Sequence, residues 1–148
     1  MPSIHLGPCH ARDRLSAFAS FSQRTKPNAF TPFAGIQCAE VSCGEGFCAV
    51  LSYEGGIFTW GSGSFGKLGH GGLWDEKNPR QVMTLSKRRA ILLACGANHV
   101  VAVTDNGSLW AWGDGRYGQL GTGALADSGR PTKVRSPSFQ HLLFGFRV

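Results

Sequence analysis

Two glycine-rich segments have the residue spacing that is closest to a known chemical site. Residues 61–68 read GSGSFGKL, which matches the G-x-G-x-x-G pattern of dinucleotide loops and the G-x-x-x-x-G-K pattern of a P-loop. A P-loop needs Ser or Thr after the lysine to hold Mg²⁺, and here that position is Leu68. Both loops also need a following helix, whereas residues 67–79 contain several glycines and Pro79. Residues 113–120 (GDGRYGQL) keep every glycine but lack the lysine, so we expect a shared turn and no cofactor.

The other reactive residue types also lack the spacing of a site. The five cysteines are Cys9, Cys38, Cys43, Cys48 and Cys95. An odd number without paired short spacings does not indicate a disulfide framework. Cys38, Cys43 and Cys48 are each five residues apart, which does not match the ligand spacing of structural zinc sites. We therefore expect reduced thiols that pack as small apolar side chains, and no bound metal. There is no catalytic triad or paired-carboxylate pattern, and we predict no catalytic residue.

An internal repeat indicates the structural units that carry the glycine-rich segments and most of the cysteines. Residues 40–83 align with residues 92–135 at an offset of 52, without a gap and with 14 identities in 44 positions. The identical pairs are Cys43/Cys95, Gly44/Gly96, Gly55/Gly107, Trp60/Trp112, Gly61/Gly113, Gly63/Gly115, Gly66/Gly118, Leu68/Leu120, Gly69/Gly121, Gly71/Gly123, Leu73/Leu125, Asp75/Asp127, Pro79/Pro131 and Val82/Val134. Two copies of one structural unit are therefore expected, over residues 40–91 and 92–143.

Each copy has the pattern of short antiparallel strands. Apolar runs at 47–52 and 99–104 lead into turns and then into aromatic-rich runs at 57–60 and 109–112. The Asn106-Gly107 step predicts a hairpin with a type I′ turn, which has positive φ at both central residues. Pro-led edge strands are expected at 79–85 and 131–134, and a buried strand at 90–94. About four strands in a period of roughly 50 residues predict an all-β fold made of propeller blades.

Residues 96–123, GANHVVAVTDNGSLWAWGDGRYGQLGTG, resemble the repeat of the regulator of chromosome condensation family, and residues 44–71 resemble the same pattern. The resemblance covers residues 35–135 and implies part of a seven-bladed β-propeller. One departure is Phe47, which stands where the second copy has His99. The repeat signature comprises Gly44, Trp60, Gly61, Gly66, Leu68, Gly69, Gly96, His99, Gly107, Trp112, Gly113, Gly118, Leu120 and Gly121.

The tryptophans and the repeat histidine allow two interpretations. Trp60, Trp110 and Trp112 are able in principle to stack on nucleic acid bases. Since Trp60 and Trp112 occupy one repeat position, packing between blades is the favoured interpretation. For His99 a place in the blade core is likewise favoured over a ligand role. The recurring Asp75 and Asp127 are expected to bond locally within their turns.

The length and the ends of the chain set further expectations. Seven such blades need more than twice this chain, so we expect a truncated or partial family member with unpaired strand edges. Residues 136–148 fit the repeat poorly. Residues 1–34 are rich in Arg and Ser and poor in acids, which indicates a disordered basic leader, with an organellar transit peptide as the alternative.

Charge and hydropathy argue against two kinds of partner for the repeat region, namely membranes and nucleic acids bound through charge. The net charge of +6 arises outside residues 40–131, which hold eight basic and eight acidic residues. The one basic run inside this region is Lys87-Arg88-Arg89, which is typical of a solvated loop. The longest apolar run spans Ala90–Cys95, far short of the roughly 20 residues of a membrane helix. We therefore expect no membrane partner and no charge-driven nucleic acid binding by the repeats.

The resemblance implies a non-enzymatic protein-interaction module in the cytoplasm or nucleus. Three specific roles are implied and stay open: guanine nucleotide exchange on a small GTPase, recruitment within a larger scaffold, kinase or ubiquitin ligase, and chromatin association. Loop positions that differ between the copies, while their glycine frame persists, are the candidates for partner contact. They are Ser64, Lys67, His70, Arg116, Gln119 and Thr122.

Overall fold

The structure is a computed structural model that describes residues 35–135. In this range the elements are β1 (Cys38–Cys43), β2 (Phe47–Ser52), β3 (Ile57–Gly61), η1 (Ser64–Gly66), β4 (Glu76–Gln81), η2 (Met83–Leu85), β5 (Ala90–Cys95), β6 (His99–Thr104), β7 (Leu109–Gly113) and β8 (Ser128–Lys133). The strands form two antiparallel sheets, ordered β1-β2-β3-β4 and β5-β6-β7-β8. This confirms the predicted all-β fold. The leader predicted at 1–34 and the tail at 136–148 lie outside the described residues.

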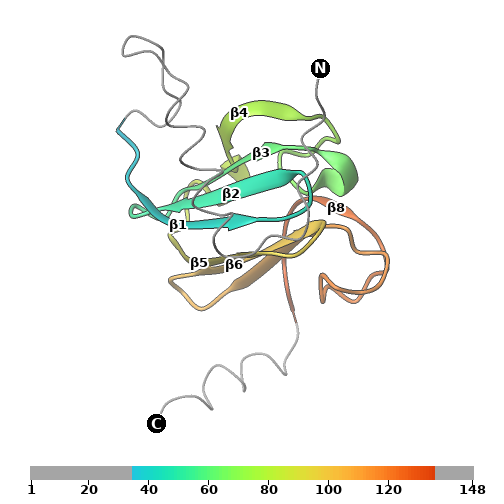
Figure 1. Cartoon of the computed structure of the whole chain (residues 1–148). Helices are drawn as coiled ribbons and strands as arrows, with labels where there is room; N and C mark the ends of the chain where they lie inside the picture. Colours follow the sequence, from blue (N-terminus) through green and yellow to red (C-terminus); the bar gives the residue numbers. More distant parts are fainter. Residues whose placement is uncertain (1–34, 136–148) are drawn as a thin grey trace.

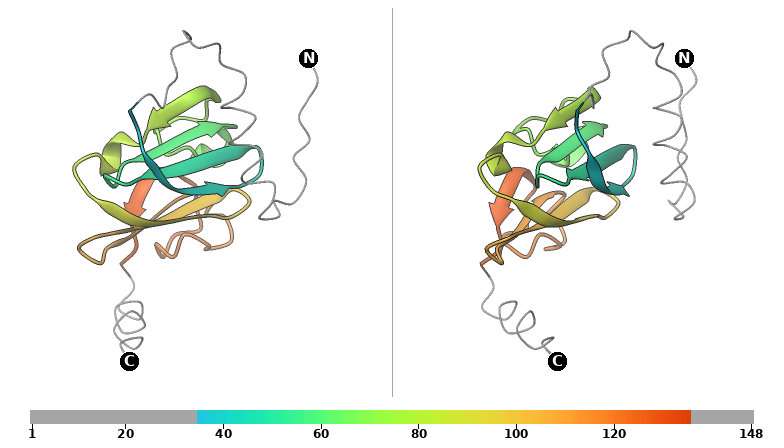
Figure 2. Two further views of the ribbon diagram at one scale, coloured as in Figure 1. Left: turned by 60° about the vertical axis from the view of Figure 1, so that its left-hand side comes forward. Right: turned by 90° about the vertical axis from the view of Figure 1, so that its left-hand side faces the viewer.

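The two sheets are two copies of one unit stacked on each other. We call β1–β4 with η1 and η2 blade 1, and β5–β8 blade 2. In Figure 1 blade 1 (blue to green) lies above blade 2 (yellow to red), and Figure 2 shows the same stacking from two other sides. Each unit is a meander in which every strand pairs with the next strand along the chain. Short local connections of this kind explain why hairpin signals in the sequence predict the sheets well.

The hairpin between β6 and β7 forms where it is predicted, but its turn type differs. Gly107 has a φ of +78°, whereas Phe65 is the only residue other than glycine with positive φ among the described residues. The Gly107 N–H donates to the Thr104 carbonyl (2.8 Å), and the Thr104 N–H donates to the Ser108 carbonyl (2.9 Å). The loop is therefore a three-residue turn closed by a glycine bulge, and the predicted type I′ turn is wrong. The Asn106 side chain accepts from the Ser108 N–H (3.1 Å), which stabilises this alternative.

The outer strands start earlier than the sequence suggests. β4 begins at Glu76 and β8 at Ser128, so Pro79 and Pro131 lie inside these strands and not at their starts. Both strands pair on one side only within the described residues. A proline is tolerated there because its missing N–H faces away from the ladder. Val82, expected in the outer strand, instead precedes η2 and is buried.

One cluster of buried side chains joins the two blades. It contains, among others, Ala49, Leu51 and Ile57 from blade 1 and Val100, Ala102, Trp110 and Trp112 from blade 2. Trp112 is fully buried, and its indole N–H donates to the Lys67 carbonyl of the other blade (3.0 Å). Gly69 lies against this ring, since a Cβ there would stand 2.8 Å from the indole nitrogen. Packing between the blades is therefore confirmed for Trp112, whereas Trp60 at the same repeat position in blade 1 is only half-buried.

No helix within residues 35–135 is long and apolar enough to cross a membrane.

Candidate functional site

The glycine-rich loops join the third strand to the fourth in each blade. The Asp75 carboxylate accepts from the Gly63 N–H (2.9 Å), and the Asp127 carboxylate accepts from the Gly115 N–H (3.0 Å). Both aspartates thus bond within their own loop as expected, but to an N–H 12 residues away and not within a short turn. Figure 1 places the loop of blade 1 (green) and that of blade 2 (orange) on the same side of the molecule. The loop of blade 1 also contacts the start of β8 in blade 2, because the Gly71 N–H donates to the Gly129 carbonyl (2.8 Å).

The loop of blade 1 lacks the geometry of a phosphate site. Three residues, Ser64–Gly66, form a 3₁₀ turn, and no α-helix follows Lys67. The aligned N–H groups of a helix N-terminus are therefore missing from this loop. Within residues 35–135, no group of three His, Cys, Asp or Glu side chains is placed to hold a metal ion.

Lys67, one of the predicted contact residues, points into the molecule. Lys67 as a whole is only 2% exposed. Its ammonium group donates to the Glu45 carbonyl (2.8 Å) and to the Asn98 side-chain oxygen (2.9 Å). The ammonium group also lies 5.3 Å from the centre of the Phe47 ring. Burial lowers the pKa of Lys67, and the nearby Glu45 and Asp75 partly offset this. Lys67 thus links the two blades and has little surface to offer a partner.

His70, another predicted contact, is half-buried beside Thr59. Its Nε2 lies 2.9 Å from the Thr59 hydroxyl oxygen, and that hydroxyl donates to the Leu68 carbonyl at 2.6 Å. Because the single hydroxyl proton is used on Leu68, Nε2 is the donor to Thr59. Burial lowers the pKa of His70, and Arg80 lowers it further, while Glu76 raises it.

Arg116 is an exposed predicted contact residue whose guanidinium is held by several contacts. Its guanidinium donates to both carboxylate oxygens of Asp114, at 3.0 Å each. The same group lies 4.5 Å from the centre of the Phe65 ring in blade 1 and 5.9 Å from that of Tyr117. This pairing lowers the pKa of Asp114 to about 2. Phe65 has a φ of +61°, a strained backbone that persists only where surrounding contacts hold it.

The remaining predicted contacts lie at or near the same surface. Ser64 is exposed, and its hydroxyl lies 3.2 Å from that of Ser62. Gln119 and Thr122 are half-buried, and the Gln119 side-chain oxygen accepts from the Tyr117 N–H (2.9 Å). His99 is half-buried with its ring directly over Gly96, and it is not one of the buried core residues among which the sequence favoured placing it.

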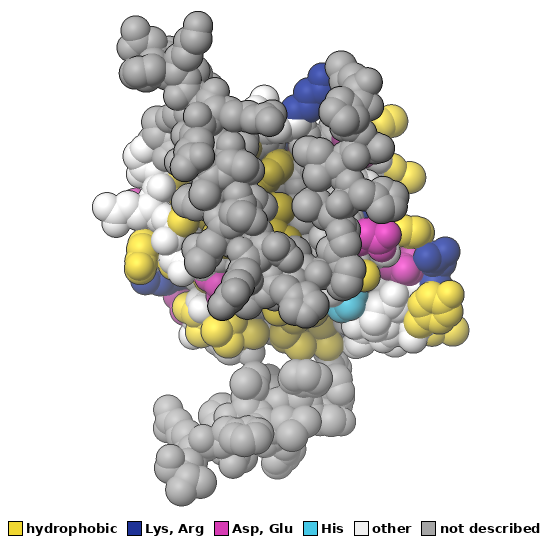
Figure 3. Space-filling model, in the orientation of Figure 1, with side chains coloured by type: hydrophobic (Ala, Val, Ile, Leu, Met, Phe, Trp, Pro, Cys, Tyr) yellow, Lys and Arg dark blue, Asp and Glu magenta, His cyan; other side chains and the backbone are white. Residues whose placement is uncertain are grey.

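Sequence reasoning missed a group of large apolar side chains on the loops. Four of them are mostly exposed, namely Leu73 (65%), Trp74 (78%), Tyr117 (84%) and Leu125 (75%). We call these four residues the loop ridge. Figure 3 shows hydrophobic side chains along the edge of the molecule where both loops lie, with charged side chains between them. The available signal was Leu73/Leu125, an identical pair in loops whose other shared residues are glycines, an aspartate and the buried pair Leu68/Leu120.

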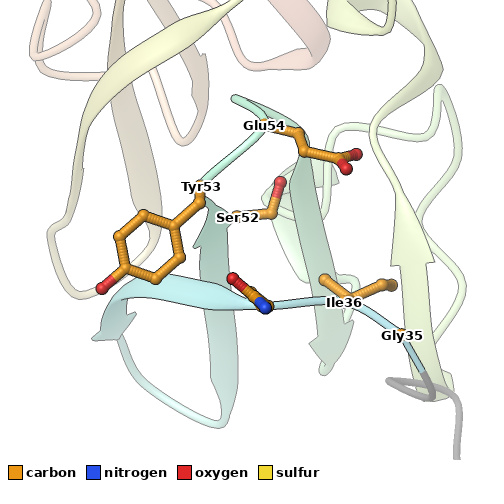
Figure 4. Close-up of a pocket in the computed structure, with 6 residues that line it drawn as sticks. Gly35, Ile36, Ser52, Tyr53 and Glu54 are labelled. Carbon is orange, nitrogen blue, oxygen red and sulfur yellow. The ribbon is translucent and has the colours of Figure 1, made fainter.

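A second surface feature is a small hollow of about 220 Å³ near the start of β1. It is lined by Gly35, Ile36, Gln37, Ser52, Tyr53 and Glu54 (Figure 4). The Ser52 hydroxyl there accepts from the Gly56 N–H (3.0 Å), so its oxygen already serves the hairpin turn. The hollow is smaller than the roughly 300 Å³ at which ligand pockets begin, and it does not suggest a substrate site.

Comparison with known proteins identifies the repeat of this chain. The family model of the regulator of chromosome condensation (RCC1) repeat matches residues 54–103 and 106–143. The chain is 40% identical over 104 residues to the E3 ubiquitin-protein ligase HERC2 of Homo sapiens, which covers 66% of this chain and 2% of the ligase.

Two solved structures have a similar fold. Human WBSCR16 matches with a TM-score of 0.62 and 32% identity over 71% of this chain and 28% of that protein. Prp20p from Saccharomyces cerevisiae, a structure reported with its binding properties to Gsp1p and histones, matches with a TM-score of 0.65 and 21% identity over 78% of this chain and 28% of that protein. The chain thus spans less than a third of these relatives. Its two sheets are like two blades of an RCC1 β-propeller, which two blades alone do not close.

Proposed function

The chain belongs to the regulator of chromosome condensation repeat family, and on that premise we propose that it is a non-enzymatic protein-interaction module. The observation that carries this proposal is the loop ridge, which exposes Trp74 and Tyr117 on adjacent loops. Aromatic residues are enriched in protein interfaces because they bury a large area at a low cost in conformational entropy. An exposed apolar group framed by polar residues is typical of a protein-binding surface.

The loops that carry the ridge are held in place before any partner binds. The carboxylates of Asp75 and Asp127 tie each loop to a backbone N–H at its start. The Arg116 guanidinium is held by Asp114 and lies over Phe65 of the neighbouring loop. Preorganised loops lose less entropy on binding, which leaves more of the apolar contact energy as affinity.

The proposed contact set combines the loop ridge with the polar candidates around it. Ser64, Arg116, Gln119 and Thr122 would form a polar rim beside the four apolar side chains. We leave Lys67 and His70 out of this rim, because their polar atoms bond Asn98 and Thr59 within the molecule. The partner class we favour is a protein recruited to a larger assembly, such as a ubiquitin ligase or kinase, in the cytoplasm or nucleus.

Substitution of the ridge tests this function. We expect the double variant Trp74→Ala/Tyr117→Ala to lose its specific partners in quantitative affinity purification by about tenfold or more, because aromatic anchors dominate interface energies. Met83→Ala is the matched control, since Met83 is 65% exposed but lies in η2, outside both loops. Proteins lost equally from both variants, or from neither, would contradict the proposed surface.

Two assays separate the alternative roles. Acceleration of GDP release from a small GTPase by substoichiometric chain would replace the scaffold role with nucleotide exchange. Chromatin association predicts DNA binding that weakens steeply with salt. We expect no such binding by residues 40–131, because their eight basic and eight acidic residues cancel.

A further inference from the structure

Two thiols face each other across the first hairpin of blade 1. Cys43 at the end of β1 pairs with Cys48 in β2, and their sulfur atoms lie 3.0 Å apart. Blade 2 has Cys95 at the position equivalent to Cys43, but its cross-strand partner there is Val100. The close dithiol is thus specific to blade 1 among the described strand pairs, and no feature of the proposed interaction surface requires it.

The backbone around these thiols matches the geometry of a cross-strand disulfide. The Gly44 N–H donates to the Phe47 carbonyl (3.0 Å), so Gly44 and Phe47 form the hydrogen-bonded pair next to the turn. The following pair, Cys43 and Cys48, is then a non-hydrogen-bonded pair, in which the Cα atoms lie about 4.5 Å apart. Disulfides span Cα separations of roughly 4.4–6.8 Å. The sulfur atoms need to approach by only about 1 Å to reach bonding distance.

We propose that Cys43 and Cys48 form a site of reversible disulfide formation with a low-molecular-weight disulfide as the oxidant. The Cys48 thiolate attacks one sulfur of the oxidant, which breaks its S–S bond, forms a mixed disulfide and releases one small thiolate. The Cys43 thiolate then attacks the Cys48 sulfur and releases the second small thiolate. Two electrons pass from the protein to the oxidant, and the two protons lost by the cysteines end on the two released thiols.

Exposure sets the order of these two steps. Cys48 is half-buried, whereas Cys43 is only 7% exposed. An external disulfide therefore reaches Cys48 first, and Cys43 acts as the resolving thiol beside it. A small thiol reductant reopens the bond by the reverse of these two exchange steps.

Peptide mapping of the full 148-residue chain after treatment with oxidised glutathione tests the proposal. Cleavage after glutamate cuts at Glu40, Glu45 and Glu54, so residues 41–45 and 46–54 carry one thiol each. We expect these two peptides to be joined until a reductant is added. Their linkage should exceed any pairing with Cys9, Cys38 or Cys95 by about tenfold, because the two thiols are held together.

Variants separate the proposed site from general thiol reactivity. Cys48→Val, which introduces the residue found at the equivalent position in blade 2, should abolish the linkage while the thermal melt is retained. Cys43→Ala should stop the reaction at a glutathione adduct on Cys48, and Cys95→Ala should leave the linkage unchanged. A stable glutathione adduct on Cys48 in the unsubstituted chain, or pairings as varied as in the urea-unfolded chain, would overturn the proposal.

Discussion

Blade 1 and blade 2 share a glycine frame but differ in the side chains that fill it. Both keep the loop clasp from Asp75 or Asp127 to a backbone N–H. In blade 1, however, Phe47 and Lys67 occupy the positions that His99 and Gln119 hold in blade 2. The Lys67 ammonium nitrogen lies over the Phe47 ring, 5.3 Å from the ring centre.

A second pair of positions differs in the same way. Thr59 and His70 hydrogen-bond at 2.9 Å in blade 1, and the equivalent residues in blade 2 are Ala111 and Thr122. Positions that touch in space have thus changed together, while the residues that shape the turns have stayed the same. The glycine frame set by backbone geometry is thus common to both blades, whereas these two pairs of contacting side chains within blade 1 are not repeated in blade 2.

The largest expected effect separates the two repeat tryptophans. Trp112→Ala should lower the free energy of unfolding by about 3–5 kcal/mol, because it removes a fully buried ring and its bond to Lys67. Trp60→Ala should lower the free energy of unfolding by clearly less, since Trp60 is only half-buried. Urea denaturation of both variants measures the difference. Equal losses would show that the two blades bury this position alike.

The next effect concerns the lysine between the blades. Lys67→Met should destabilise the chain by about 1–3 kcal/mol, because it leaves the Glu45 and Asn98 oxygens without their donor. Gln119→Met at the equivalent position should cost less than about 1 kcal/mol, since Gln119 is only half-buried. Lys67→Gln introduces the residue that blade 2 has at the equivalent position, and its loss of stability should lie between those of the other two variants. Denaturation midpoints at constant slope rank the three variants, and a neutral Lys67→Met would refute the linking role.

The smallest effect is a pH dependence that arises from His70 in blade 1. The folded protein lowers the pKa of His70 below its ordinary 6.5, so the unfolded chain takes up the proton first as the pH falls. The contribution of His70 to stability is therefore complete above pH 6.5 and declines below it. His70→Thr, the residue of blade 2, should flatten the pH dependence of unfolding in this window. An identical pH profile in the variant and the unsubstituted chain would exclude the effect.

The fold was predictable to the level of strands and blades, but not to the level of exact strand ends. The 52-residue offset and the hairpin signals place β2, β3, β6 and β7 correctly. The turn at Asn106 differed because its side chain bonds the local backbone and favours a glycine bulge over the type I′ form. The outer strands began three residues early because a proline on an edge strand does not have to mark its start.

The candidate site was less predictable than the fold. Variation between copies indicated Arg116 and Ser64, which reach the surface, but it also indicated Lys67, which is buried. The same criterion passed over Leu73 and Leu125, because they are identical in the two copies. Identity between repeats therefore does not distinguish a residue that supports the fold from one that every blade presents outward.

The repeat, the position of each hairpin and the glycine frame of the loops follow from the amino-acid sequence. These features depend on residues close together in the chain, where a positive φ or a short side-chain bond selects the turn. The tertiary structure alone decided that Lys67 is buried, that Arg116 lies over Phe65 and that Cys43 faces Cys48 at 3.0 Å. Lys67 and Asn98 are 31 residues apart, and no local propensity encodes whether such residues meet. Their contact follows from the stacking of one blade on the other, which fixes the side chains that lose their access to water.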